Sequence, residues 1–242
     1  MKLSYQAQSH IGLVRSCNED AYAVGGGQSD DYPGSLFVVC DGMGIGEAGT
    51  VAAQLASSTI IEVYYASENP DRGAALVEAF HRANERVRQQ VKSGAGGWST
   101  ATAVLVLEGK FYIAHAGNDR AYKFQNNHLR QITEDHRWSE QLIRRGIITR
   151  EDVRTHAIRD PLLRAMGDKE SIEVDLFVDK LRRNDVILLC TDGVLFGFVE
   201  DTDIERTIRE NPPEDVVGHL IDQANACGGP DNATAILVWC EE

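Results

Sequence analysis

The stretch VVCDGMGIGEAG, residues 38–49, sets a carboxylate and a glycine directly after a run of apolar residues. The run itself, LFVVC at 36–40, is continuous and apolar, which is typical of a strand buried on both faces. An Asp-Gly pair on its own is most often a turn. However, LLCTDG at 188–193 repeats the pattern, with Asp192 and Gly193 after a second apolar run. The repetition favours a functional role for Asp41 and Asp192.

Two further acidic residues extend this group. Asp20 lies in RSCNEDAY, and Asp231 lies in GGPDNATAILV, just before an apolar run. Either one alone is compatible with an ordinary solvated loop. Because strand ends can converge on one rim of a sandwich, we expect the four carboxylates to lie close together. Two unit charges about 4 Å apart repel by about 4 kcal/mol at an effective dielectric constant near 20. Such a cluster therefore calls for bound cations.

The available donor atoms indicate which cation the cluster would bind. All-oxygen ligation, with no Cys or His cluster, favours Mg²⁺ or Mn²⁺ over Zn²⁺. Gly42 fits such a site because a residue without a side chain lets its carbonyl oxygen approach a metal. One carboxylate that bridges two cations gives a two-metal site, in which bound water becomes hydroxide near neutral pH. Phosphate monoesters, whose uncatalysed hydrolysis is extremely slow, are the leading substrate class.

A basic residue completes the group of candidates. Arg15 lies five residues before Asp20. A guanidinium at that place could hold two phosphate oxygens in a bidentate fork, and the alternative is an ordinary surface arginine. Arg15 and Asp41 are the candidate catalytic residues.

The order of predicted elements indicates the fold class. Helical spacing of apolar residues covers 48–66 and 73–92, and further helices are expected within 135–146 and 200–226, the last broken at Pro212-Pro213. Between them, strand patterns at 100–107 and 110–116 flank a Glu-Gly turn, and 120–124 and 128–132 suggest a second hairpin. This order does not match an alternating parallel protein. It predicts an α+β fold with two stacked, mainly antiparallel sheets and helices outside.

Bulk properties narrow the classes of partner. The 242 residues contain no long linker, so we expect a single domain over 1–242. The net charge of -13 disfavours nucleic acid as a partner. No apolar run approaches the ~18 residues of a membrane span, and MKLSYQAQSH lacks the apolar core of a signal peptide. The five cysteines form no CxxC pair, which favours a reducing, cytoplasmic setting.

Taken in order, the motifs of this chain resemble those of the metal-dependent PP2C-type (PPM) protein serine/threonine phosphatases, bacterial branch. The segments that carry the resemblance are GLVRSCNEDAY, VVCDGMG, AHAGNDRAYKF, ITEDHRW, LIRRGIITREDVRTHAIRDPLLRAMGD, LLCTDGV and GGPDNATAILV. The resemblance implies an αββα sandwich with a flap subdomain at about 136–160. It also implies a cleft at one edge that holds two divalent cations, Mn²⁺ or Mg²⁺.

The resemblance further implies roles for individual residues. The residues that match the metal ligands are Asp41, Gly42, Asp192 and Asp231, with Asp20 holding a metal, often through water. Arg15 matches the phosphate-binding arginine, and His156 in the flap could approach the substrate. The implied reaction is direct attack by a bridging hydroxide on phosphoserine or phosphothreonine. The implied partners are phosphorylated proteins, the products of a serine/threonine kinase, and we expect a monomer.

The chain departs from the family pattern at two informative places. Ile45 and Gly46 stand where bacterial members usually have Gly-His, and that histidine is a candidate proton donor. Asn118 stands where the family has an aspartate tied to a third, weaker metal, and an amide is a poorer ligand for a hard dication. On this basis we expect an Asn118→Asp change to increase activity at millimolar Mn²⁺. Two hypotheses stay open: an active phosphatase, or a pseudophosphatase that acts as a regulatory binding partner.

Overall fold

The apolar run at 36–40 forms the first half of β3 (Ser35–Gly44) in the computed structural model, which describes residues 2–26, 34–90, 96–155, 160–195 and 201–241. Side chains alternate along β3, because successive residues of a strand point to opposite faces. Leu36 and Val38 belong to a core cluster shared with two helices, while Phe37 and Val39 belong to a cluster shared with the other sheet. The strand is therefore buried on both faces, as its composition predicts.

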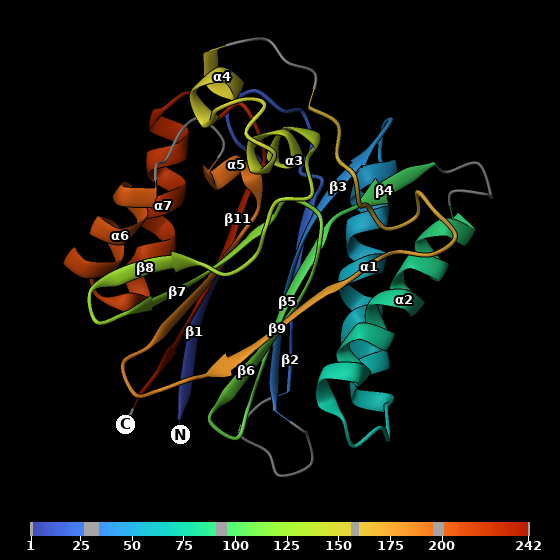
Figure 1. Ribbon diagram of the computed structural model, residues 1–242, viewed down its shortest axis with the longest axis horizontal. Helices are drawn as coiled ribbons and strands as arrows, with labels where there is room; N and C mark the ends of the chain where they lie inside the picture. The colour runs from blue at the N-terminus through green and yellow to red at the C-terminus, as the bar shows by residue number, and fades with distance from the viewer. Residues whose placement is uncertain (1, 27–33, 91–95, 156–159, 196–200, 242) are drawn as a thin grey trace.

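Two antiparallel sheets stack face to face, with helices on their outer sides (Figure 1). One sheet has the order β1 (Leu3–His10), β11 (Ala233–Cys240), β10 (Val186–Cys190), β7 (Arg120–Gln125) and β8 (His128–Gln131). The other has the order β2 (Asp20–Gly25), β3, β5 (Ala101–Leu107), β6 (Lys110–Ala116) and β9 (Asp175–Lys180), and the short β4 (Gly97–Ser99) also pairs with β3. The predicted α+β sandwich is confirmed.

The helices cover the outer face of each sheet. On the side of the sheet that contains β3 lie α1 (Ala48–Ala66) and α2 (Arg72–Gln90), visible at the right of Figure 1. On the other side lie α5 (Asp192–Leu195), α6 (Asp201–Glu210) and α7 (Pro213–Ala226). The break between α6 and α7 falls at the predicted proline pair, because a helix accepts proline in its first turn but not in its interior.

The segment expected to be a flap carries two short helices, α3 (Trp138–Arg144) and α4 (Arg150–Thr155). The helix predicted over 135–146 is thus shorter than its pattern indicates. Residues 156–159 lie outside the described residues, and with them the predicted substrate contact His156. None of the helices in the described ranges is both long and apolar enough to cross a lipid bilayer.

The expectation that the apolar strand stops at Asp41 is wrong. β3 continues to Gly44, and it changes partner on the way. Its first half pairs with β5 up to Val39, and its last three residues pair with β4. Asp41 lies at the junction between these two pairings. At this junction Asp41 keeps its pairing with Asp20 of β2 on the other side of β3.

Candidate active site

Both sheets contribute carboxylates to one rim of the sandwich. Asp20 is the first residue of β2 and is the direct cross-strand partner of Asp41. Asp192 follows β10 and opens α5, while Asp231 precedes β11, the neighbour of β10. The two sheets are joined at this rim by a hydrogen bond of 2.8 Å from Thr191 Oγ1 to Asp20 Oδ2. The register of the strands thus places all four predicted residues on the same edge.

The pKa values of Asp20, Asp41 and Asp192 are raised, first by burial and then by neighbouring carboxylates. Burial, and then the charges of Asp192 and Asp20, raise the pKa of Asp41 well above its ordinary value. Burial is also the main reason that the pKa of Asp20 rises to about 7, with Asp192 and Asp231 adding to it. The pKa of Asp192 is raised by burial, against the opposing effect of Arg137. Without a cation, these buried carboxyl groups therefore hold their protons more tightly than ordinary aspartates do.

Two arginines contact the rim. Arg15 donates from Nη2 to Asp231 Oδ2 at 2.6 Å, in a pair whose side chains are 49% and 37% exposed. Arg137 donates from Nη2 to Asp192 Oδ2 at 2.8 Å, in a pair that is only 20% and 14% exposed. Asn118 donates to the same Asp192 oxygen at 2.7 Å. Arg15 is a predicted site residue, whereas Arg137 is not; its only signal in the sequence is its position in the ITEDHRW segment.

The backbone at Asp41 is fixed by a chain of hydrogen bonds. Asp41 N donates to Thr100 Oγ1 at 2.8 Å, and Thr100 N donates to Asp41 O at 2.9 Å. Thr100 Oγ1 donates in turn to Asp119 Oδ2 at 2.7 Å. Asp119 is fully buried, and burial raises its pKa well above the ordinary value. Asn118 and Asp119 thus have different partners: Asn118 donates to Asp192, and Asp119 accepts from Thr100.

Gly42 is required by packing. A Cβ at this position would lie 2.1 Å from the carbonyl oxygen of Gly49 and 2.6 Å from that of Glu19. Both are backbone atoms that cannot move independently of their segments. The glycine lets β3 approach the start of α1, which brings Asp41 and α1 together. Gly46, by contrast, has a φ of +66° and open space around its Cβ direction, so this turn leaves room where the family's histidine would stand.

The oxygen atoms at the rim suit the cations that the resemblance implies. Four carboxylates and a backbone carbonyl are hard oxygen donors, which suit Mg²⁺ or Mn²⁺, and their mutual repulsion is what a dication would offset. Among the residues in the described ranges, no three His, Cys, Asp or Glu side chains are preset as a cage for a metal ion. Asp192 and Asp231 instead accept hydrogen bonds from arginine. The chemistry of the residues fits a dication, and closing the cage requires side-chain movement.

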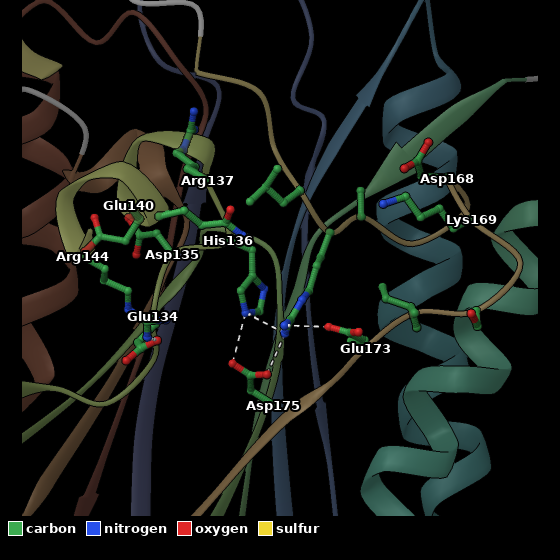
Figure 2. Close-up of a pocket in the computed structure, with 16 residues that line it drawn as sticks. Glu134, Asp135, His136, Arg137, Glu140, Arg144, Asp168, Lys169, Glu173 and Asp175 are labelled. Carbon is green, nitrogen blue, oxygen red and sulfur yellow. Dashed lines mark hydrogen bonds and ion pairs between the residues drawn. The ribbon is translucent and has the colours of Figure 1, made fainter. Parts of the chain in front are cut away.

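A cavity of about 450 Å³ lies beside this rim, lined by residues of α3 and of the segment 163–175. Figure 2 shows His136 and Asp175 directed toward each other, while Arg137 points away from them. His136 Nδ1 accepts a hydrogen bond from Gly117 N at 3.0 Å, and its Nε2 lies 3.1 Å from Asp175 Oδ2 and 2.9 Å from Arg164 Nη1. Burial lowers the pKa of His136. The histidine is a neutral structural group that fixes the segment from which Arg137 projects.

The comparisons with known proteins agree with this geometry. Residues 7–147 match the family model described as Protein phosphatase 2C. The serine/threonine phosphatase stp of Listeria welshimeri is 32% identical over 235 residues, which are 94% of this chain and 92% of that protein. The crystal structure of the Mycobacterium tuberculosis serine/threonine phosphatase PstP/Ppp has a TM-score of 0.88 at 31% identity and covers 100% of both chains. The catalytic domain of PstP in complex with two manganese ions has a TM-score of 0.84 at 30% identity, over 98% of this chain and 97% of that one.

The chain belongs to the protein phosphatase 2C family. This membership confirms the family predicted from the sequence motifs, and with it the predicted class of enzyme, a protein serine/threonine phosphatase.

Proposed function

We propose that this chain is a catalytically active phosphatase that hydrolyses phosphoserine and phosphothreonine with the help of two divalent cations, Mn²⁺ or Mg²⁺. The observation that carries the proposal is the set of carboxylates on the rim, where burial and then neighbouring charges raise the pKa values of Asp20, Asp41 and Asp192. A bound dication would favour the ionised carboxylates and offset their repulsion. The residues proposed to hold the cations are Asp20, Asp41, Asp192, Asp231 and the carbonyl of Gly42.

The bound cations would supply an activated water near neutral pH and would stabilise the charge of the reacting phosphoryl group. The chain's own residues do the rest. Thr100 fixes the backbone of Asp41, and Thr191 fixes the carboxylate of Asp20, through hydrogen bonds. Arg15 is half exposed at the rim, where its guanidinium can bind two phosphoryl oxygens once Asp231 no longer occupies it. Arg15 thus binds and orients the substrate.

The partners follow from this chemistry. The proposed substrates are phosphorylated proteins, the products of a serine/threonine kinase, and the proposed working state is a cytoplasmic monomer with one domain and a flap at about 136–160. His156 remains a proposed substrate contact in that flap.

The second candidate is a pseudophosphatase, a binding partner with little catalysis. The observation in its favour is that arginines already occupy two of the proposed ligands, Asp192 and Asp231, and that Gly46 replaces the loop histidine. Removal of one proton-transfer group typically slows a reaction by about 10²–10⁴-fold, which lowers the rate without abolishing it. The active enzyme is therefore the better supported of the two.

An assay of phosphate release decides between them. Purified protein is incubated with p-nitrophenyl phosphate and with a phosphothreonine peptide, with Mn²⁺, with Mg²⁺ and with EDTA. We expect release that depends on the metal, and its loss in Asp192→Asn and Asp231→Asn together with weaker metal binding. Asp222→Asn, an exposed aspartate on α7, is the matched control and should behave as the wild type. Absence of metal-dependent release from both substrates, at substrate concentrations up to about 1 mM, the upper end of ordinary KM values, would establish the pseudophosphatase.

A further inference from the structure

The outer oxygen of Asp192 is already occupied by two donors of this chain. Asp192 Oδ2 accepts from Asn118 Nδ2 at 2.7 Å and from Arg137 Nη2 at 2.8 Å. A carboxylate only accepts hydrogen bonds, so the amide of Asn118 must present its nitrogen, and its carbonyl oxygen faces elsewhere. The end of Asn118 that could ligate a cation is therefore turned away from Asp192.

The guanidinium of Arg137 is held in place from several directions. Its Nη1 donates to the carbonyl of Asp160 at 3.3 Å and lies 3.9 Å from the Asp160 carboxylate. That carboxylate accepts from both the N and the Oγ of Ser139, at the start of α3. The backbone of Arg137 forms an isolated bridge with Leu162. The arginine is thus a preorganised part of the rim, and little further side-chain entropy is lost when it pairs with Asp192.

This arrangement does not fit a third cation beside Asp192. The family's third metal uses an aspartate where this chain has Asn118. Here that position supplies an N–H donor, and a fixed positive charge already lies at hydrogen-bonding distance from the carboxylate that a third cation would share. A dication on the Oδ2 side of Asp192 would lie beside the guanidinium of Arg137 and the N–H of Asn118, and the two positive charges would repel each other.

We propose that Arg137 is a built-in replacement for the third cation, and that with Asn118 it limits this active site to two divalent cations. Arg137 is a positioning residue: it neutralises and orients Asp192 without touching the reacting atoms. The inference rests on the proposed two-cation function. It changes the expectation from the sequence, because an Asn118→Asp change alone would place the new carboxylate beside Arg137 and create an ion pair in place of a metal site.

The test is a count of bound cations without substrate. Mn²⁺ is titrated into the metal-free protein, with heat measured by calorimetry and free Mn²⁺ by electron paramagnetic resonance. We expect two ions for the wild type and two for N118D, but a third, weaker event at millimolar Mn²⁺ for N118D/R137Q. R150Q, which removes an exposed arginine paired with Glu140, is the control for loss of one positive charge in the flap and should bind two.

Each outcome has a defined meaning. A third event in the wild type, or in N118D alone, overturns the proposal because Arg137 would then exclude nothing. Two events in N118D/R137Q also overturn it, because the arginine would not be what limits the count. Should that variant fail to fold by circular dichroism, N118D/R137M decides on the same criterion. If the wild type binds fewer than two ions even at saturating Mn²⁺, the two-cation function itself is refuted.

Discussion

Removal of the buried charge at Asp20 should stabilise the metal-free protein, even though it damages the proposed site. Asp20 is 8% exposed, and burial with its neighbouring carboxylates raises its pKa from 3.8 to about 7. A group whose pKa is higher in the folded than in the unfolded state makes the folded state retain its proton longer. Its contribution to the free energy of unfolding therefore falls as the pH rises from about 4 to about 7, and stays constant above that.

The size of the effect follows from the shift. About three pKa units at 1.36 kcal/mol each give a penalty of about 4 kcal/mol at pH 8. Asp20→Asn removes the charge and keeps an oxygen that can accept the hydrogen bond from Thr191. In EDTA, D20N should be about as stable as the wild type near pH 4. Its advantage should then grow through pH 7 toward several kcal/mol.

Urea unfolding in EDTA at a series of pH values from 4 to 8 measures this difference directly. For D222N, which removes an exposed aspartate on α7, the free energy of unfolding should vary with pH as it does for the wild type. Mn²⁺ at about 100 times its Kd should narrow the difference, since it stabilises the wild type by about 2.7 kcal/mol and D20N lacks a proposed ligand. Equal stability of D20N and wild type at pH 8 in EDTA would refute the view that the rim is strained by its own charge.

Three further substitutions separate structural from functional roles. Gly42→Ala forces a methyl group against two backbone carbonyls, so the free energy of unfolding in urea titrations should fall by about 3 kcal/mol or more. Gly96→Ala, which has open space around its Cβ direction, is the control and should leave that free energy unchanged. Asp119→Asn should cost under about 1 kcal/mol, because burial raises the pKa of this acid and asparagine keeps an oxygen that can accept from Thr100. Asp119→Ala loses the acceptor and should cost about 1–3 kcal/mol, and equal losses in the two variants would contradict this. Arg15→Ala should lower kcat/KM for a phosphopeptide at least about tenfold and leave the stability within about 1 kcal/mol, because its pair with Asp231 is exposed; a purely structural arginine would show the reverse in the two assays.

The sequence predicts the helices and the buried strands because their apolar patterns are strong. The spacing over 48–66 matches α1 residue for residue, and the continuous run at 36–40 identifies the buried part of β3. The strands β2 and β4 were not predicted, since one is a short stretch of small residues and the other has three residues that pair only with the end of β3. Short elements of this kind are determined by their neighbours more than by their own composition.

Acidic residues next to apolar runs are visible in the sequence, so the sequence predicts that Asp20, Asp41, Asp192 and Asp231 lie close together. Their role as metal ligands stays a prediction. The partners of those residues could not be predicted, because contacts such as that between Arg137 and Asp192 join segments 55 residues apart. The sequence explains Gly42 by approach to a metal, whereas the structure shows a second and sufficient reason, the close packing of β3 against the start of α1.

The ion pairs of the two arginines on the rim differ in how much free energy is lost when they break, and this difference suggests different roles. The pair of Arg15 and Asp231 is half exposed, so breaking it costs about 0–1 kcal/mol, and an arriving cation can take Asp231 with little opposition. The pair of Arg137 and Asp192 is largely buried and braced by Asp160, and separating a buried pair leaves an uncompensated charge that costs about 3–5 kcal/mol. On the proposed function, cation binding should therefore release Arg15 toward the substrate and leave Arg137 in place. Arg15 would then be available to the phosphoryl group, and Arg137 would remain part of the framework of the site.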